Sequence, residues 1–128
     1  PLNVTLIDTR SEIDGDVPDG ITFRRVAMPE AEVTKVKPGG AVVILTHDQA
    51  LDFLIGRQAL TRDDLAYVGM IGSKTKRGTF ASFLEREGAE RAVMERLTLP
   101  IGGSAVKDKR PAVIAAMVAA ELLGLLLP

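Results

Sequence analysis

The stretch LAYVGMIGSKTKR, Leu65–Arg77, sets the expected fold because an apolar run ends in glycine and passes directly into a cationic helix start. The run 65–71 has the composition of a buried strand, and Ser73 is a good N-cap for the following helix. The first N–H groups of a helix lack intrahelical partners, and glycine lets a ligand approach them. The stretch therefore predicts a phosphate-bearing ligand. Its candidate binding residues are Gly69, Gly72, Ser73, Lys76 and Arg77, and Lys74 is a further cation on the same first turn.

A second strand-to-helix transition lies upstream of this stretch. Residues 41–45 form a short apolar run, and from Asp48 onward apolar residues recur at helical spacing, at Leu51, Leu54, Ile55 and Ala59. Thr46, His47 and Asp48 thus lie at the carboxyl end of a strand, where parallel sheets bind ligands. Asp48 either caps the helix or faces a ligand. His47 either faces solvent or contacts a ligand and carries a proton.

The beginning of the chain offers a third strand end. Residues 2–7 are apolar and β-branched, so we expect a buried strand, and Asp8 and Arg10 follow it. Asp8 either belongs to an ordinary strand-to-loop junction without a binding role, or accepts hydrogen bonds from the ribose hydroxyls of a nucleotide. Residues 21–27 alternate apolar and polar, as in an edge strand, and residues 29–37 suit a short helix or turn.

Helical patterns dominate the rest of the chain. Phe80, Phe83 and Leu84 form an apolar face that ends at Gly88, and residues 89–97 suggest a short amphipathic helix. A Pro/Gly loop over 98–104 leads to a last helix beginning near Pro111. Strands alternating with helices predict a doubly wound α/β sheet, with residues 1–128 as one domain.

The composition excludes several classes of protein. The formal net charge is -1, and one tyrosine with no tryptophan offers few platforms for stacking bases, so we expect no nucleic-acid partner. The chain has no cysteine and a single histidine, which excludes a thiolate nucleophile and a Cys or His metal cluster and suits the cytoplasm. The apolar C-terminal stretch contains Glu121 and is too short to span a bilayer, so we expect no membrane segment.

Several segments together resemble the C-terminal Rossmann-like domain of the xanthine dehydrogenase accessory proteins. They are residues 46–48, residues 67–77, Leu99–Gly102, and residues 111–121. The resemblance implies a Rossmann-like, mostly parallel sheet. It also implies a central strand with a Gly-x-Gly-x-x-Gly turn that would lie before Pro1, so we expect a gap beside the strand that ends at Asp8. Either a partner chain fills this gap, the segment exists elsewhere in the native protein, or the order of the strands differs.

The resemblance implies a chaperone domain that binds the molybdenum cofactor during its sulfuration and insertion, with no catalysis of its own. The implied partners are a xanthine dehydrogenase type enzyme and a sulfur-donating desulfurase, and we expect a homo-oligomer. Two alternatives remain: an NAD(P)- or flavin-binding oxidoreductase domain, and a non-catalytic protein-interaction domain. Replacing Lys76 and Arg77 by Ala is predicted to weaken phosphate binding with little loss of stability.

Overall fold

The computed structural model describes residues 3–9, 20–101, 119, 122 and 126. The five strands are β1 (Val4–Asp8), β2 (Ile21–Arg25), β3 (Ala41–Ile44), β4 (Tyr67–Met70) and β5 (Leu97–Thr98). The α-helices are α1 (Pro29–Glu32), α2 (Gln49–Leu60) and α3 (Lys74–Arg86), and two 3-10 helices cover Val33–Lys35 and Arg91–Arg96. Of the predicted last helix the structure describes only residues 119, 122 and 126, which are helical, and Arg10 lies outside the described residues.

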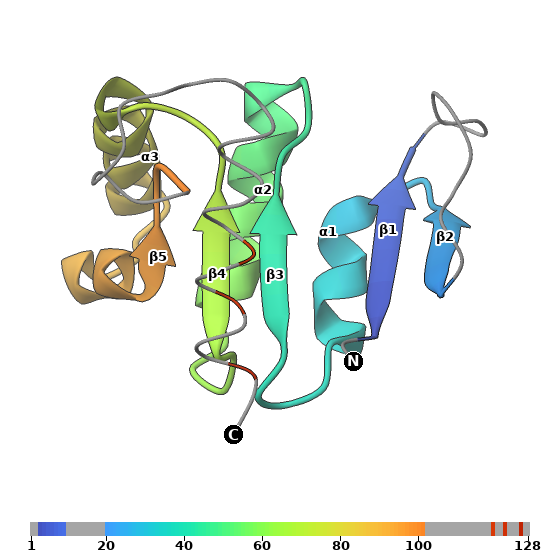
Figure 1. Ribbon diagram of the computed structural model, residues 1–128. Coiled ribbons are helices and arrows are strands. Elements are labelled where there is room, and N and C mark those ends of the chain that lie inside the picture. The colour runs from blue at the N-terminus through green and yellow to red at the C-terminus, as the bar shows by residue number, and fades with distance from the viewer. Residues whose placement is uncertain (1–2, 10–19, 102–118, 120–121, 123–125, 127–128) are drawn as a thin grey trace.

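All strand pairs are parallel, and they form two separate sheets. β1 pairs with β2, while β3, β4 and β5 form a three-stranded sheet in that order. Figure 1 shows both sheets with their strands running in the same direction and with α1 drawn between β3 and β1. The predicted α/β, Rossmann-like fold is therefore confirmed in a partial form, and within the described residues β1 and β3 share no ladder.

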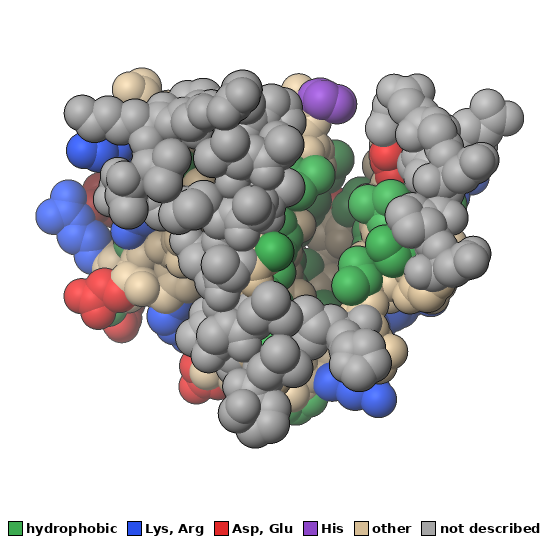
Figure 2. Space-filling model, viewed as in Figure 1, with side chains coloured by type: hydrophobic (Ala, Val, Ile, Leu, Met, Phe, Trp, Pro, Cys, Tyr) green, Lys and Arg blue, Asp and Glu red, His purple; other side chains and the backbone are tan. Residues whose placement is uncertain are grey.

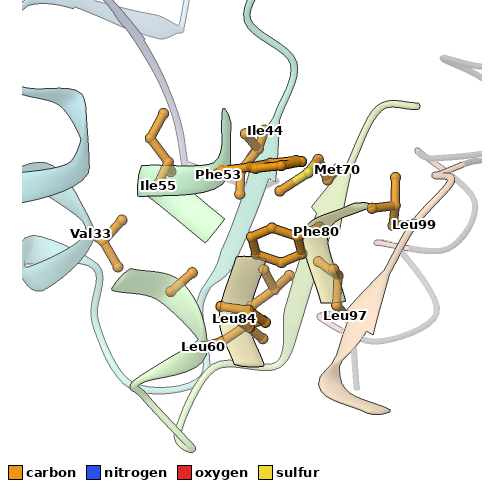
Figure 3. Close-up of a cluster of buried hydrophobic side chains, with 12 residues drawn as sticks. Val33, Ile44, Phe53, Ile55, Leu60, Met70, Phe80, Leu84, Leu97 and Leu99 are labelled. Atoms are coloured by element: carbon orange, nitrogen blue, oxygen red, sulfur yellow. The ribbon is translucent and has the colours of Figure 1, made fainter. Parts of the chain in front are cut away.

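The hydrophobic core lies between the three-stranded sheet and the two longer helices. Ile44 and Met70 come from β3 and β4, Phe53 from α2, and Phe80 and Leu84 from α3. Figure 3 shows the Phe80 ring in the middle of this cluster, and the Phe53 and Phe80 ring centroids are 4.8 Å apart. Parallel strands covered by helices need continuous apolar runs, and all four residues of β4 are buried as a result.

Three expectations from the sequence need correction. Residues 4–8 do form a strand, but it is not buried: Leu6 is 37% exposed, and among the described strands β1 pairs only with β2. In α2 the inward aromatic is Phe53, and Leu54 points outward. The segment expected as a helix to Leu97 is a 3-10 helix over 91–96, and Leu97 begins β5, which pairs with β4.

Candidate functional site

The candidate site lies at the carboxyl edge of the three-stranded sheet, where β3 and β4 end side by side. Ile44 and Met70 are register partners, and the backbone N–H of Ile71 donates to the carbonyl oxygen of Ile44 at 2.9 Å. The segments that follow these strands, 46–48 and 72–73, are therefore neighbours. The structure brings together two of the segments that the sequence marked as binding residues.

A buried carboxylate connects these two segments. Asp52 in α2 is 1% exposed, and its Oδ1 accepts from the backbone N–H of Thr46 at 3.0 Å and from the Thr46 hydroxyl at 2.7 Å. Its Oδ2 lies 2.7 Å from Nζ of Lys76, which also donates to the carbonyl oxygen of Ile71 at 2.7 Å. The ends of β3 and β4 are thus fixed to α2 and α3 by one network, defined here as the Thr46–Asp52–Lys76 network.

The two cations of the predicted phosphate site are engaged inside the chain. The Lys76 side chain is 13% exposed and its charge is balanced by Asp52. The Arg77 guanidinium donates to the carbonyl oxygens of Met94 at 3.0 Å, Leu97 at 3.1 Å and Leu99 at 3.3 Å. The expectation that replacing Lys76 and Arg77 by Ala costs little stability is therefore not supported. Each replacement would remove buried hydrogen bonds.

The start of α3 keeps unused donors. The Ser73 hydroxyl oxygen accepts from the backbone N–H of Lys76 at 3.1 Å, which confirms Ser73 as the N-cap. No acceptor is present for the backbone N–H groups of Lys74 and Thr75 in the described part of the chain, and the Lys74 side chain is exposed. The donors that remain for an anion are therefore these two N–H groups and one ammonium.

The two glycines of this stretch have different roles. Gly72 has φ of 154°, and a Cβ there would lie 2.4 Å from Cδ of Lys76, so this position favours glycine beside the site. Gly69 lies within β4, and a Cβ there would lie 2.5 Å from Cε1 of Tyr67 and 2.7 Å from Cγ2 of Ile101. Gly69 therefore permits packing of the sheet and does not lie at its edge.

The other strand end contributes a cap and an exposed imidazole. Oδ1 of Asp48 accepts from the backbone N–H groups of Ala50 at 2.9 Å and Leu51 at 3.3 Å, so the capping interpretation of Asp48 is confirmed. His47 is exposed at the same edge. No group of three or more His, Cys, Asp or Glu side chains suited to a metal ion occurs among the residues that the structure describes.

Asp8 lies on the other sheet. It ends β1, and its Oδ1 accepts from the backbone N–H of Thr9 at 2.7 Å. Because β1 and β3 belong to different sheets among the described strands, Asp8 and Thr46 lie at the ends of strands that do not pair. The structure thus groups Thr46, His47, Gly72 and Ser73, whereas Asp8 forms a second, separate part of the edge.

Asp52 is the residue that the sequence interpretation missed. It lies four residues after the capping Asp48, between the apolar residues Leu51 and Phe53. An acid on the inward side of an amphipathic helix implies a buried partner, since an unpaired buried carboxylate is costly. That signal points to a buried partner, but the spacing alone does not identify Lys76, which lies 24 residues away.

Comparison with known proteins agrees with this architecture. The family model described as the XdhC Rossmann domain matches residues 1–122. The crystal structure of a xanthine dehydrogenase from Bacillus halodurans superposes with a TM-score of 0.75 at 24% identity, over 96% of this chain and 35% of that chain. This chain therefore corresponds to about a third of that longer one, and the likeness supports the fold.

Two further searches found nothing, one among curated proteins and one for membrane-spanning helices. No curated protein matches the chain significantly. Among the described residues, no helix has the length and apolar character needed to cross a bilayer. Since the family model covers nearly all of the sequence, the chain belongs to the XdhC Rossmann domain family.

Proposed function

We propose that this domain binds the molybdenum cofactor at the carboxyl edge of its sheet and serves a xanthine dehydrogenase type enzyme as an accessory domain without turnover of its own. The observation that carries the proposal is the match of the XdhC Rossmann domain over residues 1–122. The proposed binding site lies where β3 and β4 end, next to Thr46 and Gly72. Open α/β sheets bind ligands at this edge.

The donors at this edge suit the phosphate end of a pterin cofactor. The free N–H groups of Lys74 and Thr75 would donate to a phosphate oxygen, and the exposed Lys74 ammonium would balance the phosphate charge. Thr46 and His47 would contact the remainder of the ligand from the neighbouring strand end. The bound group would supply the redox chemistry of molybdenum to the recipient enzyme, and the protein's part is to bind and shield it.

The proposal extends to partners. A desulfurase would supply the sulfur of the mature cofactor, and the recipient enzyme would take the loaded cofactor by direct contact. Both steps need access to the same sheet edge, so we place them in sequence. A homo-oligomer in the cytoplasm and a bound nucleotide form of the cofactor belong to the same proposal.

Calorimetry on the complete protein tests this function. We expect the molybdenum cofactor to bind at micromolar concentration and Lys74→Ala to weaken binding about fivefold, which corresponds to about 1 kcal/mol for one charge-assisted contact. Lys37→Ala is the matched control, because Lys37 is also an exposed lysine but precedes β3 at the opposite end of the strand. No binding, or equal affinities for both variants, would contradict the proposal.

NADH provides the competing arm of the same experiment. Asp8 at the end of β1 occupies the position of a ribose-binding acid in dinucleotide folds, which is the observation in favour of the oxidoreductase alternative. Binding of NADH with higher affinity than the molybdenum cofactor would support that alternative. Binding of neither ligand would favour the protein-interaction alternative.

A further inference from the structure

The turn that presents His47 is held on both sides by hydrogen bonds. The backbone N–H of Thr46 and its hydroxyl both donate to Oδ1 of Asp52, at 3.0 Å and 2.7 Å. The Thr46 hydroxyl oxygen in turn accepts from the backbone N–H of Asp48 at 3.1 Å. His47 lies between these two held residues, and Figure 2 shows its imidazole at the surface of the molecule. The backbone of His47 is therefore fixed, while its ring stays accessible.

The same carboxylate reaches the start of α3 through Lys76. Oδ2 of Asp52 lies 2.7 Å from Nζ of Lys76. The ammonium also donates to the carbonyl oxygen of Ile71 at 2.7 Å, and the backbone N–H of Lys76 donates to the capping hydroxyl of Ser73 at 3.1 Å. Asp52 thus connects the turn after β3 to the segment that carries the free N–H groups at the start of α3.

Gly72 leaves room for this connection. It has a φ of 154°, and a Cβ at this position would overlap Cδ of Lys76. The Lys76 side chain therefore passes through the place that the Cβ of any other residue would occupy, and it reaches the carboxylate of Asp52 from there. A side chain at position 72 would displace the ammonium from Asp52.

Packing of the core does not require this ion pair. Phe53, Phe80 and Leu84 already join α2 and α3 in the apolar cluster, and the Phe53 and Phe80 ring centroids lie 4.8 Å apart. A buried ion pair adds little net stability compared with well-packed apolar residues, because both charges lose their hydration. The pair lies at the ligand edge, and both carboxylate oxygens are engaged. These features indicate a role in the geometry of the edge.

We propose that Asp52 is a positioning residue for the ligand edge. It is 1% exposed and both of its oxygens are occupied, so it offers no oxygen to a ligand. It holds the turn with His47 and the start of α3 at one fixed spacing, and a ligand meets both sides without first ordering them. Preorganised sites bind more tightly because less conformational entropy is lost on binding. The effect on affinity rests on the proposed function, whereas the fixed geometry of the edge does not.

Two charge-neutral double variants separate position from charge. Asp52→Asn with Lys76→Met removes both charges and the contact between the two side chains. Asp52→Asn with Lys76→Gln removes the same charges, but the Asn amide can donate to the Gln side-chain oxygen and the Gln amide to the carbonyl oxygen of Ile71. The first variant cuts the connection, and the second restores it. Glu85→Gln with Arg91→Met is the matched control, because it neutralises an exposed ion pair of 2.8 Å near the other end of α3.

NMR relaxation of the backbone amides in the complete protein without ligand tests the geometry. For His47 and Lys74 we expect order parameters of about 0.85 in the unmodified protein, the control and the Lys76→Gln double variant, and below about 0.6 in the Lys76→Met double variant. Unchanged order parameters in the Lys76→Met double variant, or equally lowered ones in both, would overturn the proposal whether or not a ligand binds. If that variant does not fold, Gly72→Ala takes its place, since it displaces Lys76 and keeps both charges.

Calorimetry with the molybdenum cofactor tests the consequence for binding. We expect the Lys76→Met double variant to bind about tenfold more weakly than the unmodified protein, and the Lys76→Gln double variant to recover most of that loss. An equal loss in both double variants would show that charge and not position decides the affinity, and would overturn the proposal. If the unmodified protein binds no cofactor, the proposed function fails, and the order parameters still decide whether Asp52 fixes the edge.

Discussion

The two sheets differ in burial although their sequences are similarly apolar. Leu6 in β1 is 37% exposed, whereas Ile44 in β3 is 2% exposed and Met70 in β4 is fully buried. β4 has strands on both sides and α2 and α3 against it, while β1 has only β2 beside it among the strands that the structure describes. The difference teaches that an apolar run predicts a strand, but that its neighbours decide how much surface the strand buries.

The largest expected effect tests this difference in burial. Phe80 is fully buried and contacts the rings of Phe53 and Phe83, so Phe80→Ala should lower the free energy of unfolding by about 4 kcal/mol. Leu6→Ala should lower it by less than about 1 kcal/mol in the 128-residue chain, because little apolar area is lost. Urea unfolding followed by circular dichroism measures both. Equal costs for Leu6→Ala and Phe80→Ala in the 128-residue chain would contradict the contrast between the two sheets.

The next effect concerns the buried ion pair at the edge of the three-stranded sheet. Lys76→Met leaves the Asp52 carboxylate, 1% exposed, without its charged partner and should cost about 3 kcal/mol. Asp52→Asn combined with Lys76→Met should cost clearly less than the sum of the two single variants, since neither charge is then left unpaired. A double-mutant cycle from urea unfolding measures the coupling, and strict additivity would contradict the pairing.

A smaller effect is expected at Arg77, which joins α3 to β5 and to the preceding 3-10 helix. Arg77→Lys keeps the positive charge, but a lysine lacks the planar guanidinium that donates to three carbonyl oxygens at once. The substitution should therefore lower the free energy of unfolding by about 2 kcal/mol. Arg86→Lys is the control on the same helix, since Arg86 is exposed and should cost less than about 0.5 kcal/mol. Equal midpoints of thermal unfolding for the two variants would contradict the role of Arg77.

The local part of this structure could be predicted from the sequence. Periodicity and capping residues located α2 and α3, and the caps at Asp48 and Ser73 are present. The short strand β5 was missed because two residues, Leu97 and Thr98, carry no periodicity of their own and pair only because β4 offers an edge. The pairing of Lys76 with Asp52 was missed because it depends on how two helices pack, which no local pattern records.

The smallest effect tests how the two-stranded sheet is attached to the rest. Glu32 in α1 contacts Arg24 of β2 at 2.9 Å and Lys35 at 2.7 Å. The hydrogen bond from the Lys35 ammonium, assisted by the charge of Arg24, holds the pKa of the Glu32 carboxyl below its ordinary value of 4.5. Because the folded-state pKa is lowered, this contribution to stability is present above about pH 4.5 and is lost as the pH falls through the folded-state value.

Glu32→Gln should therefore lower the urea midpoint slightly at pH 7, and the difference from the unmodified chain should shrink progressively as the pH falls below about 4.5 and the carboxyl takes up its proton. Lys35→Gln removes the main cause of the lowered pKa, so in that background the pH dependence of the Glu32→Gln effect should weaken. A difference that stays constant between pH 7 and pH 3.5 would show that Glu32 joins β2 to α1 through packing alone. In that case the two-stranded sheet would be held to the core without an electrostatic link.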